Sequence, residues 1–573
     1  MRALRVWTLA LVVVVVAVVA GGGCKKDDGS DLPSEMKPRR ASVDPGKLDL
    51  PKLLEQIPAD TPFIVAGLEA VPLAYYAKMK KAFGGLIDAA FTAWRLTSSD
   101  DNKLLDAVLS EMDGKWNAEG IESLGLSSQP RFAVYGQSGV APIVARIEVK
   151  DAKVVLATFE RIARKVDKEL PPMETRGGKS FWRIPAKPGK SEGVVALVDN
   201  QLVFAAGPPA AIERSLDLVL GIEKPKDNLG DAKQLTELMT RHGFGANLIG
   251  FVDTRRILLE AAKDEGRKTD ACEDEIARIA KKIPRIAFGY GELTAERTSA
   301  GLVVELSPEL VAKVEALRTE VPGLARALSD EPLIAMGGGL DIAKGQELML
   351  SFADVMRDAG EACHAEEVVS RAKRMTRKLD KDLPEAARKI TGFAGALTEI
   401  EFGGRRRRTP IPDSLDAFAC VSSRDAKDLF EEILDEAREI RRLDIKTDGS
   451  MHAIDAKLPV ELDLYAGVGS TALCTAAGKT GKSMANHALG ARPGKAPFFA
   501  ASYDWGKYVD IYLDIIPERE LHSDFDADSP RSHRERAMTM TALRTMSRVL
   551  GRTTMTVDIS DKGLAAWAAI ETK

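Results

Sequence analysis

Runs of alternating apolar residues along the chain end at an aspartate or serine, and a helical repeat of apolar positions starts directly afterwards. A side-chain oxygen at such a boundary can accept hydrogen bonds from the free N–H groups of the first helical turn. The pattern therefore predicts short strands followed at once by helices. The predicted helix starts follow Asp151, Asp253, Ser307 (with Pro308 behind it), Asp425, Asp504 and Asp561.

Other segments have alternating apolar residues in two short runs separated by turn residues, which predicts pairs of strands joined by tight turns. Residues 192–207 place Asp199-Asn200 between two apolar runs, and residues 285–306 repeat this pattern around 294–300. Strand–helix units interrupted by hairpins predict an α+β fold with antiparallel sheets covered by helices on one face. A weak recurrence of 131–220 in 285–350 and 415–515 leads to the hypothesis of repeated, duplicated modules.

Breaks in the pattern suggest the domain boundaries. The segments 221–234 and 403–414 are candidate linkers, and they divide the chain into modules at 49–225, 240–402 and 414–573, with an acidic insertion at 516–535. Four arginines, Arg405 to Arg408, lie in the second linker. We interpret them as the solvated tip of a hairpin, with contact to an anion or an envelope polymer as the alternative.

The N-terminus has the organisation of a secretory signal peptide, predicted at residues 1–23. Arg2 and Arg5 precede an apolar run from Trp7 to Ala20, and small residues follow it. The run has 14 residues, fewer than the roughly 20 that a membrane-spanning helix needs. An uncleaved anchor helix and an ordinary secreted protein are the alternatives.

Three glycines lead directly into Cys24, which resembles the lipobox of bacterial lipoproteins, although Gly21 stands where that family has an aliphatic residue. The resemblance implies cleavage before Cys24 and acylation of this cysteine by palmitate-type chains. Each buried methylene would contribute roughly 0.8 kcal/mol to membrane anchoring. Family rules for Lys25 imply the outer rather than the inner membrane. The polar stretch at 24–48 is predicted to be a disordered tether.

The start of the body, Pro58-Ala59-Asp60-Thr61, resembles the "PADT" phrase of a family of secreted bacterial proteins of unknown function. Residues 196–217 resemble the strand–turn–strand–helix segment of the same proteins. The resemblance covers about a third of the chain. It implies a cell-envelope location and supplies no catalytic residues.

Composition narrows the classes of partner. The chain has 573 residues, of which 45% are hydrophobic, a size that fits two to four domains. Loss of the signal peptide moves the formal charge from −4 to −6, so neither nucleic acid nor an anionic membrane face is an expected partner. Aromatic residues make up only 6%, which disfavours an aromatic platform for sugars.

Four cysteines remain after Cys24, and an even number in an oxidising compartment indicates two disulfides. We predict Cys272–Cys363, because both lie in acidic helix-like segments. We likewise predict Cys420–Cys474, because both lie in strand-like segments. A metal cluster around Cys363 with His364, Glu366 and Glu367 is the alternative.

Gly481-Lys482-Ser483 imitates the end of a phosphate-binding loop, G-x-x-x-x-G-K-[ST]. Ala476 stands at the first glycine position, and the signal peptide directs the chain away from cytoplasmic ATP. We therefore interpret the segment as a Gly/Lys surface turn and expect no nucleotide.

One further segment has the spacing of a calcium loop. Asp524, Asp526, Asp528 and Glu535 stand at positions 1, 3, 5 and 12, but Ser529 replaces the glycine needed at position 6. An exposed acidic insertion is the default interpretation, and calcium is the only candidate cofactor.

Hydrolase motifs are weak. The sequence around Ser138 does not have G-x-S-x-G spacing, and the six histidines show no paired metal-ligand spacing. We predict a lipid-anchored cell-envelope protein of non-catalytic binding or scaffolding type, whose partner is an unknown envelope protein or polymer. The alternative is an envelope hydrolase with a site between modules. An exposed apolar sheet face would favour binding, and a deep polar pocket would favour the enzyme.

Overall fold

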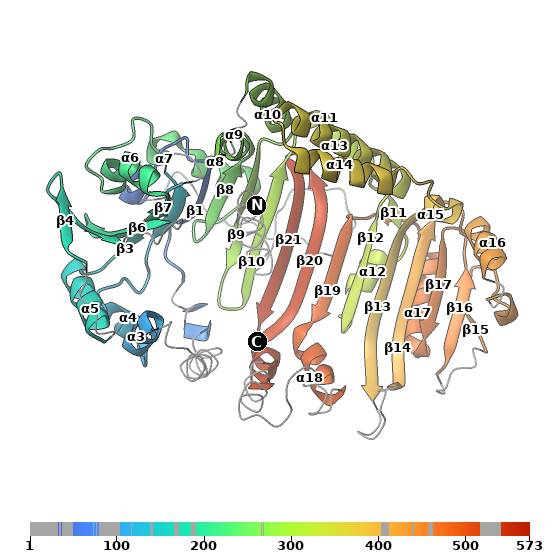
Figure 1. Ribbon diagram of the computed structural model, residues 1–573. Coiled ribbons are helices and arrows are strands. Elements are labelled where there is room, and N and C mark those ends of the chain that lie inside the picture. The colour runs from blue at the N-terminus through green and yellow to red at the C-terminus, as the bar shows by residue number, and fades with distance from the viewer. Residues whose placement is uncertain are drawn as a thin grey trace.

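One large antiparallel sheet organises the part of the chain that the computed structural model describes (Figure 1). The described residues are 32–33, 36, 48, 50–72, 74–75, 77–79, 103–115, 117–137, 141–165, 171–184, 191–264, 266, 269–329, 331–402, 412–437, 440–455, 462–515, 540–541 and 543–573. Helices and a large antiparallel sheet confirm the predicted α+β class. Among these residues no helix is both long and apolar enough to cross a membrane.

The strands of the first half are β1 (Phe63–Gly67), β2 (Phe132–Gly136), β3 (Ile143–Glu148), β4 (Met173–Arg176), β5 (Lys179–Ile184), β6 (Glu192–Val198), β7 (Gln201–Gly207), β8 (Ile249–Asp253), β9 (Arg285–Leu293) and β10 (Arg297–Glu305). Those of the second half are β12 (Ile334–Gly339), β13 (Ile390–Phe402), β14 (Pro412–Ser423), β15 (His452–Ala453), β16 (Leu464–Val468), β17 (Ala472–Ala477), β19 (Phe499–Asp504), β20 (Leu550–Ser560) and β21 (Gly563–Thr572). Two short strands, β11 (Glu320–Val321) and β18 (Gly494–Lys495), pair separately.

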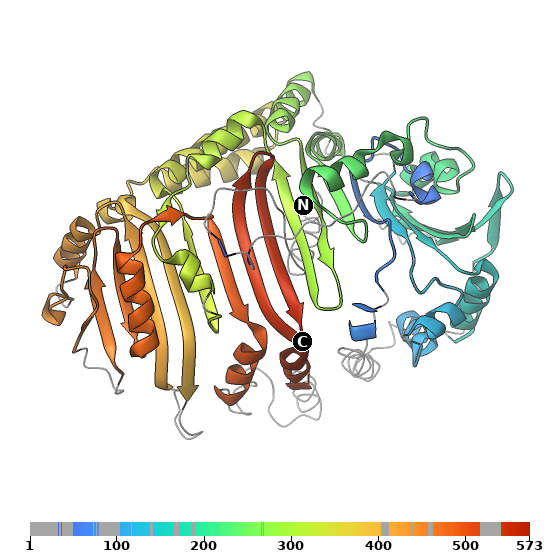
Figure 2. The same ribbon diagram turned by 180° about the vertical axis from the view of Figure 1, so that it is seen from behind.

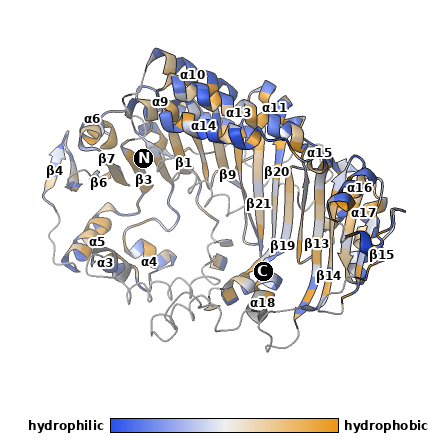
Figure 3. Ribbon diagram, turned by 45° about the vertical axis from the view of Figure 1, so that its right-hand side comes forward, coloured by the Kyte–Doolittle hydropathy of each residue, from blue (hydrophilic) through white to orange (hydrophobic). Residues whose placement is uncertain are grey.

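The helices before β10 are η2 (Lys52–Gln56), α3 (Lys103–Met112), α4 (Ala118–Ser123), α5 (Ala152–Lys165), α6 (Pro209–Val219), α7 (Leu229–Ala232), α8 (Gln234–His242), α9 (Thr254–Asp264) and α10 (Asp270–Lys282). Those after it are α11 (Pro308–Glu315), α12 (Leu324–Ser329), α13 (Ile342–Ala362), α14 (Glu366–Leu379), α15 (Glu385–Lys389), α16 (Ala426–Glu436), η4 (Ile440–Leu443), α17 (Gly478–Gly490) and α18 (Trp505–Ile515). Figure 3 shows many hydrophilic residues on α10, α13 and α14, which run across one end of the strands.

Apart from β4, which has no counterpart, the strand order is the same in both halves of the sheet when each half is followed from its outer end to the middle. From one end it runs β4–β5–β6–β7–β3–β2–β1–β8–β9–β10, and it continues β21–β20–β19–β12–β13–β14–β17–β16–β15. The last strands of the two halves, β10 and β21, pair with each other in the middle. The sheet is therefore continuous through the three ranges that we predict as modules, and that division stays a prediction.

Most of the predicted helix starts are confirmed. Asp151, Asp253, Asp425 and Asp504 each accept hydrogen bonds from N–H groups in the first turn of the helix that follows, and Ser307 caps α11 with Pro308 behind it. These contacts satisfy donors that would otherwise lack partners. Five different helices thus begin at the positions predicted from the sequence.

The start predicted after Asp561 is wrong. Residues 563–572 are strand β21, which pairs on one side with β20 and on the other with β10. An alanine-rich sequence favours a helix locally, but here two neighbouring strands supply its hydrogen bonds. The ring of Trp567 lies so close to Gly301 that a Cβ atom at that glycine would be 1.9 Å from it, which explains the small residues in this region.

The predicted hairpins are confirmed. Strands β6 and β7 pair over their whole length, and the turn residues Asp199 and Asn200 have φ angles of 51° and 58°. Two residues with positive φ match the right-handed twist of a two-residue hairpin. Strands β9 and β10 form the second predicted hairpin.

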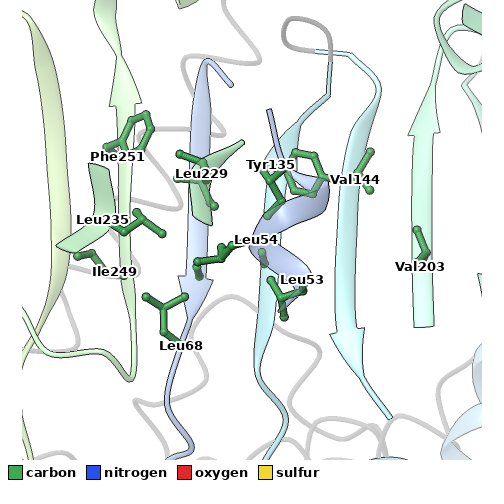
Figure 4. Packing of buried hydrophobic residues seen from close by; sticks show 14 of the residues in the cluster. Leu53, Leu54, Leu68, Tyr135, Val144, Val203, Leu229, Leu235, Ile249 and Phe251 are labelled. Carbon is green, nitrogen blue, oxygen red and sulfur yellow. The ribbon is translucent and has the colours of Figure 1, made fainter. Parts of the chain in front are cut away.

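One face of the sheet carries the two main hydrophobic cores. In the first half, η2, α6 and α8 pack there around Ile64, Tyr135 and Val203. Figure 4 shows Leu53 and Leu54 of η2 near Tyr135. In the second half, α12 and α17 cover the same face, as the view from behind shows (Figure 2). We call this side the covered face. The predicted cover on a single face is incomplete, because α5 and α16 pack on the opposite face near the two ends of the sheet.

Two residues from the stretch predicted to be a tether also belong to the second core. Leu32 and Met36 are buried beside Val321 and Leu324. The chain therefore contacts the second half at this point before it enters β1 in the first half.

Candidate functional site

The face opposite the covered face exposes large apolar side chains on β12, β13 and β14. Met336, Phe393 and Val421 have exposed fractions of 43%, 41% and 38%. Phe393 and Val421 are direct cross-strand partners, and Met336 stands opposite Gly395 on β13. Figure 1 shows β13 and β14 unobstructed from this side. We call these three residues the open patch.

Apart from Leu473 on β17, which stands opposite Val421, the cross-strand neighbours of the open patch are small and uncharged. Gly338 lies opposite Phe393, Ala419 opposite Gly395, and Ala501 opposite Met336. Since cross-strand partners point to the same face, large apolar side chains here alternate with positions that have little or no side chain. The result is a shallow apolar surface on inner strands, each of which already has partners on both sides.

A disulfide lies directly behind the open patch. Cys420 precedes Val421 and stands opposite Cys474 on β17, and their sulfurs are 2.02 Å apart. Both side chains point into the second core, where they are 2% exposed. This pair agrees with the sequence prediction and joins β14, which carries Val421, to its neighbour β17.

The second predicted pair is also present. The sulfurs of Cys272 and Cys363 are 2.01 Å apart, and they join α10 to the C-terminal end of α13. The alternative metal cluster at Cys363 gains no support, because its sulfur is bonded to Cys272. The described residues contain no group of three or more His, Cys, Asp or Glu side chains that could hold a metal ion.

The segment that imitates a phosphate-binding loop is part of a helix, so our interpretation as a surface turn is wrong. Gly481, Lys482 and Ser483 lie within α17. The carboxylate of Asp416 accepts hydrogen bonds from the N–H groups of Thr480 and Gly481, at 2.8 Å and 3.1 Å. A carboxylate of the protein therefore occupies the helix N-terminus that would have to bind phosphate. The ammonium of Lys482 lies 4.4 Å from the centre of the Tyr465 ring.

The glycine at 481 has a packing role that can be tested. A Cβ atom there would lie 2.1 Å from the carbonyl oxygen of Ala417. We expect Gly481→Ala to lower the free energy of unfolding by about 1–3 kcal/mol, as overpacking does. Gly490→Ala in the same helix is the control, because nothing lies within 4 Å of its Cβ position. Urea unfolding that gives both variants the same stability would contradict this role.

Several predicted residues lie outside the described part of the chain. They are the lipidation residue Cys24, the calcium candidates Asp524, Asp526, Asp528 and Glu535, the arginines Arg405 to Arg408, and Ser138. Their roles stay predictions.

One histidine belongs to a buried ionic cluster that the sequence did not reveal. Nε2 of His242 lies 2.7 Å from Oε1 of Glu305, and Nε of Arg285 donates to the other carboxylate oxygen at 2.7 Å. Burial alone would raise the pKa of Glu305, but hydrogen bonds from His242 and Arg285 and the charge of nearby Arg241 outweigh it and lower the pKa to about 2. The cluster fastens α8 to the β9–β10 hairpin. The partners are 20 and 63 residues from Glu305 along the chain, so no local pattern indicates them.

Comparison of the chain with family models, with curated proteins and with solved structures gives no match. The fold and the open patch define the class by themselves: an α+β protein with a continuous antiparallel sheet that exposes apolar side chains on one face.

Proposed function

We propose that this chain is a lipid-anchored, extracytoplasmic protein of the bacterial cell envelope that binds or scaffolds a partner without catalysis. The proposal places acyl chains on Cys24 and the partner on the open patch. The envelope location rests on the resemblance of residues 1–24 to a lipoprotein signal.

The open patch is the observation that supports binding. Apolar residues on the surface of a monomer usually stand singly, whereas three of them adjoin on the open patch. Burial of Met336, Phe393 and Val421 against a partner would release this surface from water, at roughly 25 cal/mol per Å². Hydrogen-bonding groups are absent from the side chains of the patch and of its registered neighbours Gly338, Gly395, Ala419 and Ala501. Such a surface suits an apolar segment of a partner.

A photo-crosslinker in place of Phe393, in the full-length chain in its own cells, tests this role. We expect a discrete adduct, and we expect Met336→Asp to reduce its yield by about tenfold, since a charge must then be buried on binding. The control is the same crosslinker at Met173, which is 49% exposed on β4 at the far end of the sheet. The same adducts at both positions, or a yield that Met336→Asp leaves unchanged, would contradict the proposal.

We further propose that the two halves arose by duplication. The shared strand order supports it, as does the short helix that precedes the first strand of each half. Leu53 and Leu54 are buried residues of η2, which precedes β1 in the sequence. Leu324 and Leu328 are buried residues of α12, which precedes β12. The matching ranges under this proposal are 132–219 and 390–490, which replace the recurrence of 131–220 in 285–350.

A further inference from the structure

A second surface, in the first half of the molecule, is lined by charged and polar side chains, unlike the apolar open patch. A cleft of 730 Å³ lies at one end of strands β1, β2 and β8, between the segment Pro58–Pro62, the connection after α6 and the start of α9. Its size is that of small-molecule sites in proteins. It includes Pro58, Ala59 and Asp60 of the "PADT" phrase, whose role the motif itself does not indicate.

Gln137, the residue directly after β2, is the unusual member of the lining. Its side chain is 3% exposed, yet neither the oxygen nor the nitrogen of its side-chain amide has a hydrogen-bond partner within the part of the chain that the structure describes. Buried polar groups without partners are rare in folded proteins, because they have lost their hydrogen bonds to water. A side-chain amide has both a donor and an acceptor to offer. Because Gln137 lines the cleft, a ligand that reaches its amide can satisfy both atoms if it carries both groups as well.

The wall of the cleft is held in place by the backbone of the "PADT" phrase. The carbonyl oxygen of Ala59 accepts hydrogen bonds from Gln234 at 3.0 Å and from Arg256 at 3.3 Å, and the N–H of Ala59 donates to the carbonyl of Asp227 at 2.9 Å. Arg256 also donates to the carbonyl of Thr61 at 3.3 Å. These bonds join three separate segments, so the protein itself holds this wall of the cleft in place.

Charges of both signs line the same cleft. Lys226, Asp60 and Asp227 are exposed, and the side chains of all three make no hydrogen bond or ion pair with the described residues. Charged groups without a partner among the described residues, in the same cleft as a buried amide, suit a ligand that carries both charges itself. Among the described residues of the lining there is no aromatic ring on which a sugar could stack. These described residues also include no serine, threonine, cysteine or histidine that could act as a nucleophile.

We propose that this cleft binds a short zwitterionic peptide. The amide of Gln137 bonds to a peptide group of the ligand, Lys226 attracts its terminal carboxylate, and Asp60 and Asp227 attract its terminal ammonium. The inference goes beyond the proposed function, because it uses no residue of the open patch and does not require Cys24 to be acylated.

Calorimetric titration of the full-length chain in detergent with trialanine tests the proposal, with trialanine amide as the second probe. We expect Lys226→Gln to weaken trialanine binding by about tenfold and to leave the amide, which has no carboxylate, unaffected. Lys224→Gln is the matched control, because Lys224 pairs with Glu55 and does not line the cleft. An equal loss for both probes, or no binding of trialanine by the unaltered protein, would overturn the peptide assignment.

Gln137→Met separates a ligand-binding role from a structural one. We expect this variant to melt at a higher temperature than the unaltered protein without ligand, because an unpartnered buried amide is removed. We also expect it to lose trialanine binding. A lower melting temperature would mean that Gln137 has a structural partner, and would overturn the proposal. Binding of tri-N-acetylglucosamine in place of trialanine would overturn the ligand class. Neither the melting temperatures nor the binding results bear on the proposed role of the open patch.

Discussion

Replacement of Glu305 by glutamine is expected to lower the free energy of unfolding by about 3–5 kcal/mol, the cost of breaking a buried ionic cluster. Glu305 is 1% exposed, and its carboxylate bonds to His242 and Arg285 at 2.7 Å each. Glutamine keeps the shape of the side chain and removes its charge, which leaves the Arg285 guanidinium without its partner. Urea unfolding at pH 7 measures the difference.

The loss of stability in Glu305→Gln is expected to depend on pH, because the carboxylate of Glu305 titrates. The pKa of Glu305 is lowered from 4.5 to about 2 in the folded protein. The ionised carboxylate therefore contributes fully to the free energy of unfolding above about pH 4.5, and this contribution is lost as the pH falls towards 2. The shift in pKa corresponds to at most about 3 kcal/mol. The difference between the unaltered protein and Glu305→Gln should shrink over this window.

Glu309→Gln is the control for both measurements. Glu309 carries the same charge four residues further on, but its side chain is 69% exposed and pairs with Lys313 on the surface. We expect its effect to stay within about 0.5 kcal/mol. A stability difference for Glu305→Gln that is as small as this, or that does not change between pH 4.5 and pH 2, would contradict the assigned role of the cluster.

Removal of the Cys272–Cys363 disulfide by a double substitution with serine is expected to cost about 2–5 kcal/mol. The bond links residues 91 apart in sequence, so its loss gives the unfolded chain considerable freedom. Cys272 is fully buried in a small cluster with Ile276 and Ala262, and the bond fixes the α13–α14 hairpin to α10. Hydrogen exchange should therefore show faster exchange in α13 and α14.

The corresponding removal of Cys420–Cys474 provides the comparison. These cysteines lie on strands that the β-ladder already holds side by side, and they are 54 residues apart in sequence. We expect a similar loss of global stability but no faster exchange in α13 and α14. Unchanged exchange in that hairpin after removal of Cys272–Cys363 would show that the bond does not hold it.

Features set by neighbouring residues could be predicted from the sequence. The helix starts at Asp151 and Asp425 and the hairpin at Asp199-Asn200 are of this kind, because a cap or a tight turn depends on residues a few positions apart. The cysteine pairs could also be predicted, since the local setting of each cysteine matched that of its partner. The prediction after Asp561 failed because the partners of β21 come from β20 and from β10, which lies more than 250 residues away in sequence.

The candidate sites depend on the order of the strands in the sheet. The pattern of apolar and polar residues along the chain does not predict this order. Met336, Phe393 and Val421 come from three strands that follow each other across the sheet, and the helices α13, α14 and α15 separate β12 from β13 in the sequence. Each is unremarkable in its own strand, since single exposed apolar residues are common. The missing partner of Gln137 likewise becomes visible only when the structure shows that the side chain is buried.

Intact mass spectrometry of the protein purified from its own membranes tests the central claim most directly, namely that this is an extracytoplasmic binding protein held by its N-terminal cysteine. We predict a chain that begins at Cys24 and carries acyl chains on that residue. A chain that retains residues 1–23, or one that begins at Cys24 with an unmodified thiol, would contradict the claim.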